Sequence, residues 1–263
     1  MGERQSAGLI DVQRQGQHVA IVTITRPEAR NAINAEVAKA MDAAVAAIEA
    51  DENVRAVVLT GSGDRAFCSG ADLRVVAAGR LDDLFTTGGG FAGFVNAPRR
   101  KPWIAAVNGF ALAGGCEIAL ACDMVVAVPD ARFGLPEVTR GLIASAGGLY
   151  RLPRALPRAI AFELIATGQP IDAMRAYALG LVNRICGPGT LMKEALALAE
   201  QIAVNAPLAV IESLRLARIA AKTDDDALRL AGDEAQARLA RTADFAEGAL
   251  AFVEKRNPCW QGR

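Results

Sequence analysis

The 263-residue sequence predicts an α/β fold followed by a helical C-terminal part. Up to about residue 190, short apolar runs rich in β-branched residues alternate with segments of helical spacing. This alternation is typical of layered proteins with a mostly parallel sheet. From Leu191 onward nearly every segment has helical spacing. We therefore predict an α/β core over residues 1–190 and a helical oligomerisation region over residues 191–263.

Four segments of the core predict buried strands, because they are short, apolar and rich in β-branched residues. They cover residues 18–25, 56–61, 103–109 and 124–128. Between the first two, Asn34 is expected to cap a helix. The apolar face of that helix carries side chains spaced by four, four and three residues, at Val37, Met41, Val45 and Ile48. A second, short helix is expected from about Gly114 to Cys122.

The C-terminal part predicts several consecutive helices. One apolar stripe consists of Leu191, Ala195, Leu198 and Ile202. Asn205 is expected to cap the next helix, with Pro207 in its first turn, and amphipathic spacing continues through Val253. Helices that leave an apolar face uncovered often pack on another subunit, so this part is expected to form the oligomer interface.

Composition argues against several classes of function. Lys plus Arg and Asp plus Glu both number 29, whereas nucleic-acid binding or attachment to an anionic membrane favours a basic excess. The single histidine, His18, is expected at the surface, and the cysteine spacings do not suit zinc. Five cysteines without a CxxC pair, and an N-terminus without a secretory signal, favour a cytoplasmic protein with reduced thiols.

A glycine-rich segment, TTGGGFAG, contains Gly88, Gly90 and Gly93 in the G-x-G-x-x-G spacing. A dinucleotide site needs a buried strand before this motif and an acidic residue after a second strand. Neither is present, so we interpret the segment as a flexible loop.

Three other segments are predicted to be loops at the ends of strands, where α/β sheets commonly bind ligands. They are AFCSGADL (66–73), LAGGCEIAL (112–120) and FGLPEV (133–138). Small residues occur in all three, and small side chains let a backbone approach a ligand closely. Any one of them taken alone is better explained as a turn or a tight packing contact.

Together the three segments provide backbone donors and carboxyl groups that could act on one bound carbonyl compound. The backbone N–H groups of Ala71 and Gly114 are expected to be free donors, the second at a helix N-terminus. Two converging donors can hold the oxygen of a carbonyl that becomes an enolate. Glu117, in an apolar stretch, and Glu137 can then exchange protons with a water and the substrate. Burial would raise the pKa values of both carboxyl groups.

These segments, in this order, resemble the crotonase superfamily, which comprises enoyl-CoA hydratases, isomerases and their relatives. The resemblance extends over most of the chain, through ITRPEARNAIN (24–34), AFCSGADL, AVNGFALAGGCEIALACD (106–123), ARFGLPEVTRGLIASAGGLYRLPR (131–154) and the final NPCWQGR. It implies a spiral of ββα units, a helical C-terminal trimerisation region, and trimers that often pair into hexamers. It also implies an acyl-CoA substrate and no metal or cofactor apart from the coenzyme A of the substrate.

The resemblance also implies a role for individual residues. Ala71 and Gly114 match the oxyanion N–H groups that bind the thioester oxygen. Asp72, Leu73 and Arg74 match the positions that line the coenzyme A path. Glu117 matches the group that activates water, and Glu137 matches the group that protonates C2. Since isomerases generally keep only the second glutamate, the presence of both favours hydration of 2-trans-enoyl-CoA.

Two departures from the family pattern concern the acyl pocket. Ala144-Ser145 replaces Pro-Gly, and Leu149-Tyr150 replaces Thr-Gln. The resemblance places this wall, and the TTGGGFAGF loop, beside the acyl group, so both are expected to affect which acyl chain binds. Alternatives are another reaction on the same site, such as carnitinyl-type dehydration or isomerisation, and a non-catalytic acyl-CoA-binding protein.

Overall fold

The computed structural model describes residues 8–187 and 189–263. Its strands form a six-stranded sheet, a four-stranded sheet and a small hairpin. The strands of the first sheet, in spatial order, are β1 (Ile10–Gln15), β2 (Val19–Ile24), β3 (Ala56–Gly61), β7 (Trp103–Val107), β9 (Met124–Ala127) and β12 (Arg184–Ile185). Those of the second are β11 (Ile171–Asp172), β10 (Arg132–Gly134), β8 (Phe110–Leu112) and β4 (Ala66–Cys68). The hairpin pairs β5 (Phe85–Thr86) with β6 (Gly90–Phe91).

Ten α-helices and three short 3-10 helices accompany these strands in the described residues. The α-helices are α1 (Ala35–Ala50), α2 (Leu73–Ala77), α3 (Gly114–Ala121), α4 (Gly148–Ala155), α5 (Arg158–Thr167), α6 (Ala173–Ala178), α7 (Leu191–Ala203), α8 (Pro207–Ala220), α9 (Asp225–Leu239) and α10 (Ala243–Glu254). The 3-10 helices are η1 (Pro27–Ala29), η2 (Leu81–Leu84) and η3 (Pro136–Arg140).

The chain winds as a spiral in which each turn contributes one strand to each sheet and then a helix. β3 is followed by β4 and α2, β7 by β8 and α3, and β9 by β10 and η3. The predicted α/β class and the spiral of ββα units are therefore confirmed. The four predicted strands are all present, and Asn34 caps α1 by accepting a hydrogen bond from the N–H of Val37 (2.9 Å).

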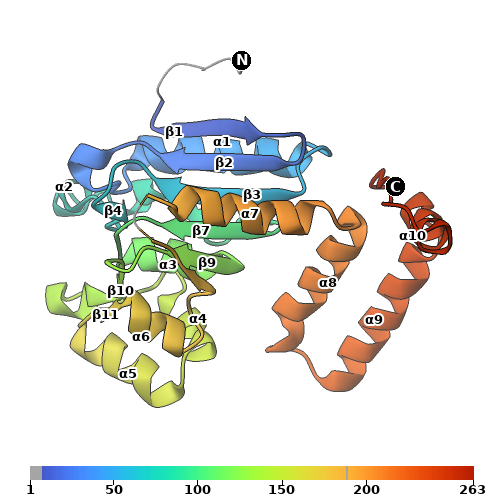
Figure 1. Ribbon diagram of the computed structural model, residues 1–263. Coiled ribbons are helices and arrows are strands. Elements are labelled where there is room, and N and C mark those ends of the chain that lie inside the picture. The colour runs from blue at the N-terminus through green and yellow to red at the C-terminus, as the bar shows by residue number, and fades with distance from the viewer. Residues whose placement is uncertain (1–7, 188) are drawn as a thin grey trace.

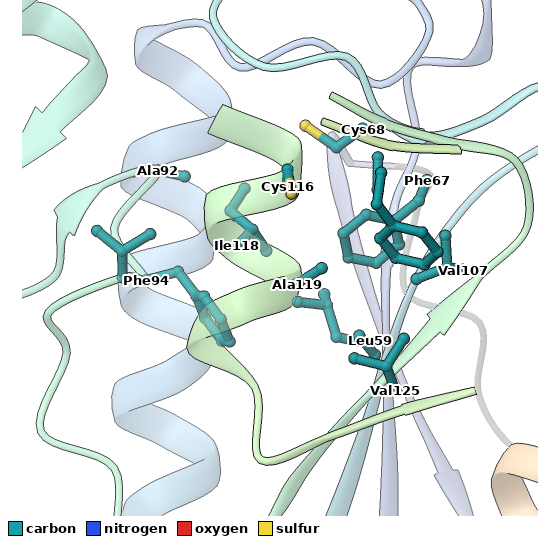
Figure 2. Close-up of a cluster of buried hydrophobic side chains, with 14 of the residues drawn as sticks. Leu59, Phe67, Cys68, Ala92, Phe94, Val107, Cys116, Ile118, Ala119 and Val125 are labelled. Atoms are coloured by element: carbon teal, nitrogen blue, oxygen red, sulfur yellow. The ribbon is translucent and has the colours of Figure 1, made fainter. Parts of the chain in front are cut away.

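Both faces of the six-stranded sheet are buried, which explains why its strands are almost continuously apolar. Along β3, Val57 and Leu59 join the larger core with α1 and α3, whereas Ala56 and Val58 pack against α7. In Figure 2, Ile118 and Ala119 of α3 are among the buried side chains of this larger core, together with Leu59 and Val125.

α7 packs on the six-stranded sheet, although the sequence predicts that the α/β core ends at residue 190. Leu191, Ala195, Ala199 and Ala203 form the buried face of α7. The following helices, α8 to α10, lie to one side of the sheets (Figure 1), and no residue of α8 is buried. Asn205 does not cap α8 as predicted. The cap is Ala206, because Pro207 already occupies the first turn, and the Asn205 amide donates to Gln201 O at the end of α7 (3.0 Å).

In the part of the chain that the structure describes, no helix alone has the length and apolar character to cross a membrane. The bent pair α7 and α8, with 106° between them, meets the length and composition criteria jointly.

Candidate active site

Three short parallel strands bring the predicted site together. In the second sheet β8 lies between β10 and β4, and all three run in the same direction. Their C-terminal ends therefore lie at one edge of the sheet. Ala71 follows β4, Gly114 follows β8 and Glu137 follows β10, so residues from three turns of the spiral meet at that edge. From the sequence these segments are predicted only as loops, since strands of three residues give no periodic pattern.

A cavity of about 730 Å³ opens at this edge. Every predicted site residue lines it: Ala71, Asp72, Leu73, Arg74, Gly114, Glu117 and Glu137. Its lining also includes Arg26, Phe85 and Arg140, for which the sequence predicted no role, and Phe91 of the TTGGGFAGF segment, which was expected beside the acyl group. The structure thus brings the complete predicted set together.

The N–H of Gly114 is presented by a strained backbone. Ala113, the residue before α3, has φ 51° and ψ −130°, a conformation that a residue with a β-carbon rarely adopts. The N–H of Ala113 donates to Gly134 O (3.0 Å), which ties this turn to β10. Gly114 is then the first helical residue, where an N–H has no partner within the helix. The strained residue therefore lies directly before Gly114, and both residues line the cavity.

Glycines at this edge are required by close contact. A β-carbon on Gly70, where φ is +92°, would lie 2.8 Å from the Ala113 β-carbon and 2.9 Å from the Gly114 nitrogen. A β-carbon on Gly114 would lie 2.4 Å from Cε1 of Phe91. The ends of β4 and β8 therefore approach each other closely, with the Phe91 ring against them.

Glu117 is a buried carboxyl group with one defined partner. It lies on the first turn of α3, it is 3% exposed, and its Oε1 accepts a hydrogen bond from the N–H of Gly148 (2.9 Å). Burial raises the pKa of Glu117 to about 7, against the opposing effect of the Gly148 N–H, and the charge of Glu137 raises it further. The group can therefore accept or release a proton near neutral pH.

Glu137 is buried with an unsatisfied oxygen. It is the second residue of η3, which Gly141 terminates by adopting the left-handed conformation. Burial raises the pKa of Glu137, and the positive charge of Arg140 partly opposes this effect. Its Oε2 has no hydrogen-bond partner among the described residues. Since buried polar atoms in proteins are usually paired, this oxygen is available to a molecule in the cavity.

The position of Glu117 predicts that its charge destabilises the fold. The folded pKa, about 7, lies above the ordinary value of 4.5, so the folded state binds more protons than the unfolded state between these values. Stability then falls as pH rises from 4.5 to about 7 and stays low above it. We expect Glu117→Gln to be more stable than the wild type at pH ~8, by on the order of 3 kcal/mol. Urea unfolding measures this difference.

The comparison at pH ~4 is the control for that prediction, because the carboxyl group of Glu117 is then largely protonated in both the folded and the unfolded state. The two proteins should be equally stable there. An advantage of the same size at pH ~4 and pH ~8 would contradict the prediction.

The glycine-rich segment differs from the prediction in its conformation, although it contributes Phe91 to the cavity lining. TTGGGFAG forms part of a tight hairpin rather than a flexible loop, and the β-carbon of a residue replacing Gly93 would lie 2.3 Å from Ala38 O. This hairpin places Phe85 and Phe91 on the cavity, edge to face with centroids 5.6 Å apart. Of the two departures near the acyl pocket, Ser145 lines the cavity but Leu149 and Tyr150 do not.

The chain matches known proteins over nearly its whole length. A family model described as Enoyl-CoA hydratase/isomerase matches residues 14–263. A "Probable enoyl-CoA hydratase" of Rhizobium meliloti (strain 1021) is 43% identical, over 93% of this chain and 95% of the relative. A "Carnitinyl-CoA dehydratase" of Proteus mirabilis (strain HI4320) is 38% identical, over 92% and 94% respectively.

Solved structures show the same similarity in three dimensions. The crystal structure of enoyl-CoA hydratase from Mycobacterium tuberculosis H37Rv superposes with a TM-score of 0.92 at 42% identity, covering 97% of this chain and 99% of that one. Sequence and structure therefore agree, and the chain belongs to the enoyl-CoA hydratase/isomerase family.

Proposed function

We propose that this protein is an enoyl-CoA hydratase, which adds water reversibly across the double bond of a 2-trans-enoyl-CoA to give a 3-hydroxyacyl-CoA. The observation that carries the proposal is one cavity lined by two buried carboxyl groups, Glu117 and Glu137, and by the backbone of Ala71 and Gly114. The relatives named above as enoyl-CoA hydratases support the same reaction.

Each group has one task in the proposed reaction. Ionised Glu117 takes a proton from a water molecule while the oxygen of that water forms a bond to C3. The electron pair of the double bond moves to the thioester, and the N–H groups of Ala71 and Gly114 form the oxyanion hole that holds the resulting enolate oxygen. Glu137, protonated, then gives its proton to C2. Glu117 then releases its proton to solvent and Glu137 takes one up from solvent, so both groups return to their starting protonation states.

Coenzyme A is proposed to lie along Asp72, Leu73 and Arg74. These residues follow Ala71, lead into α2 and line the same cavity. Arg74 is exposed and offers a guanidinium to a phosphate. No cofactor besides the coenzyme A of the substrate is proposed, because the proton transfers use only groups of the chain. The five unpaired cysteines favour a cytoplasmic location.

Dehydration of a carnitinyl-type substrate is the second candidate, favoured by the name of the Proteus mirabilis relative. Such a substrate carries a trimethylammonium group, and Arg140 opposes its binding. Arg140 lies three residues after Glu137 on η3, where side chains at this spacing lie above one another. Among the described residues its guanidinium donates only to the hydroxyl of Thr139 (3.1 Å), and Arg140 lines the cavity, so no carboxylate of these residues forms an ion pair with it there.

A substrate panel distinguishes these candidates. We expect the wild type to hydrate crotonyl-CoA with higher kcat/KM than an enoyl-CoA bearing a trimethylammonium group at C4. Arg140→Leu should raise the relative kcat/KM for the cationic substrate about 2- to 30-fold, which is the Coulomb effect of charges roughly 8 Å apart. A wild-type preference for the cation would favour the second candidate. Double-bond migration without water addition would indicate an isomerase, and no turnover would indicate a binding protein.

The C-terminal helices support a further proposal, that the protein forms a trimer or a dimer of trimers. Several large apolar side chains on and near α9 and α10 are exposed, namely Val204, Leu230, Phe245, Leu250, Phe252 and Val253. Phe252 is 85% exposed and Val253 77%, which is unfavourable unless a partner covers them. Light scattering at micromolar concentration should give a trimer or a hexamer, and a stable monomer would contradict the proposal.

A further inference from the structure

The N–H of Ala71 is directed by a pairing between two loops. Ile33 and Ala71 form an isolated parallel bridge, in which the N–H of Ile33 donates to Gly70 O (2.8 Å) and the N–H of Asp72 donates to Ile33 O (2.8 Å). In such a bridge the residue between the two bonds has its own N–H turned away from the partner strand. The N–H of Ala71 therefore points away from Ile33, and Ala71 lines the cavity.

Arg26 holds both sides of this bridge. Its Nη1 donates to Ala32 O (2.6 Å), just before Ile33, and its Nη2 donates to Asp72 Oδ2 (3.1 Å), just after Ala71. The side chains of Arg26 and Asp72 are each only 15% exposed, so solvent screens their attraction less than at the surface. The planar guanidinium fixes two acceptors in one geometry, which a lysine cannot reproduce.

Asn31 in turn fixes the backbone that carries Arg26. It is fully buried, and its Oδ1 accepts from the N–H of Arg26 (3.0 Å). Its amide nitrogen donates to Ser62 O (3.0 Å) and to Ala66 O (2.7 Å), which lie just after β3 and at the start of β4. The position of Arg26 is thereby tied to both strands that precede the Ala71 loop.

We propose that Arg26 is a positioning residue for the oxyanion donor at Ala71, a role that rests on the proposed hydration. Arg26 also lines the cavity, so a direct contact with a coenzyme A phosphate is the competing explanation. The geometry favours positioning, because both terminal nitrogens of Arg26 already donate to protein acceptors. A misdirected donor weakens the hydrogen bond to the enolate more than it weakens binding of the ground state.

The test uses the full-length protein with Arg26→Gln and Arg26→Lys. Two quantities are measured. The first is kcat and KM for crotonyl-CoA. The second is the infrared stretching frequency of a ¹³C-labelled thioester carbonyl in bound butyryl-CoA, which has no double bond and cannot be hydrated. For Arg26→Gln we expect kcat to fall about 10-fold or more while KM changes less than about 3-fold. The carbonyl frequency should move toward its value in solution, and Arg26→Lys should lie between Arg26→Gln and the wild type.

Arg218→Gln is the matched control. Arg218 also forms a partly buried pair with an aspartate, Asp123, with both bonds at 2.8 Å, and neither residue lines the cavity. A general loss of stability would affect both variants, whereas only Arg26→Gln should shift the carbonyl frequency. Should Arg26→Gln fail to fold, Asp72→Asn replaces it. This change keeps a side-chain oxygen for the N–H of Arg74 but weakens the contact with Arg26.

The outcomes separate the two proposals. A wild-type carbonyl frequency in folded Arg26→Gln, or in Asp72→Asn, overturns the positioning role, as does a rise in KM with unchanged kcat. A frequency shift that depends on Arg26, in a protein that hydrates no enoyl-CoA, supports positioning while the proposed hydration fails.

Discussion

Replacing either buried glutamate by glutamine should lower kcat for crotonyl-CoA hydration by about 10²- to 10⁴-fold, the contribution typical of a positioned acid or base. An amide retains the size of Glu117 and one acceptor for the N–H of Gly148, so the loss reflects proton transfer rather than a collapsed cavity. The decay of the enoyl thioester absorbance measures the rate. Asp244→Asn is the matched control, since Asp244 is another buried carboxylate, 4% exposed, outside the cavity.

Two further measurements assign the roles within the pair. In D₂O, the enzyme should exchange the C2 proton of a saturated acyl-CoA through Glu137, so Glu117→Gln keeps this exchange and Glu137→Gln loses it. Hydration by the wild type should decrease as pH falls through about 7, because Glu117 is then protonated and cannot accept a proton from water. Near wild-type hydration in both variants would show that the proton-transfer assignment is wrong.

Gly114→Ala should lower kcat about 100-fold with a smaller change in KM, an effect comparable to the loss of one oxyanion donor. The new β-carbon would lie 2.4 Å and 2.5 Å from Cε1 and Cζ of Phe91, so the start of α3 or the ring must move. Steady-state kinetics on crotonyl-CoA measure the effect.

A second substitution tests the cause of that loss. Phe91→Leu, added to Gly114→Ala, removes the ring and should restore part of kcat. Gly88→Ala is the control in the same glycine-rich segment, because its nearest neighbour, Asp42 Oδ1, lies at an ordinary 3.7 Å. Equal losses in Gly88→Ala and Gly114→Ala would contradict a specific role for the Gly114 N–H.

Local patterns predicted those elements that are long enough to show a period. The strand over residues 56–61 and the Asn34 cap of α1 are confirmed because each depends on neighbouring residues alone. The strands β4, β8 and β10 have three residues each and were missed. Their order in the sheet, which depends on tertiary contacts, decides which loops meet.

The site shows the same limit. Glu117 is recognisable as a carboxylate in an apolar stretch. The small-residue segments after predicted strands indicate Ala71, Gly114 and Glu137, and the family motifs agree with them. The TTGGGFAGF segment was expected beside the acyl group, but the contact of Phe91 with Gly114 was not predicted, because it depends on the fold of the β5–β6 hairpin. Arg26 lies in the family motif ITRPEARNAIN, but its contact with Asp72 joins segments far apart in the chain and has no local sequence pattern.

The spiral has a consequence for how this enzyme can diverge. The proposed thioester donors follow β4 and β8, whereas the group proposed to protonate C2 belongs to η3, in a separate turn. A change confined to η3 and the residues after it, such as Glu137, Arg140 or Ser145, can therefore alter the reaction or the accepted acyl group. The parts that hold the thioester need not change. Evolution toward a new reaction can thus proceed one turn at a time, from an ancestor that already activates the same functional group.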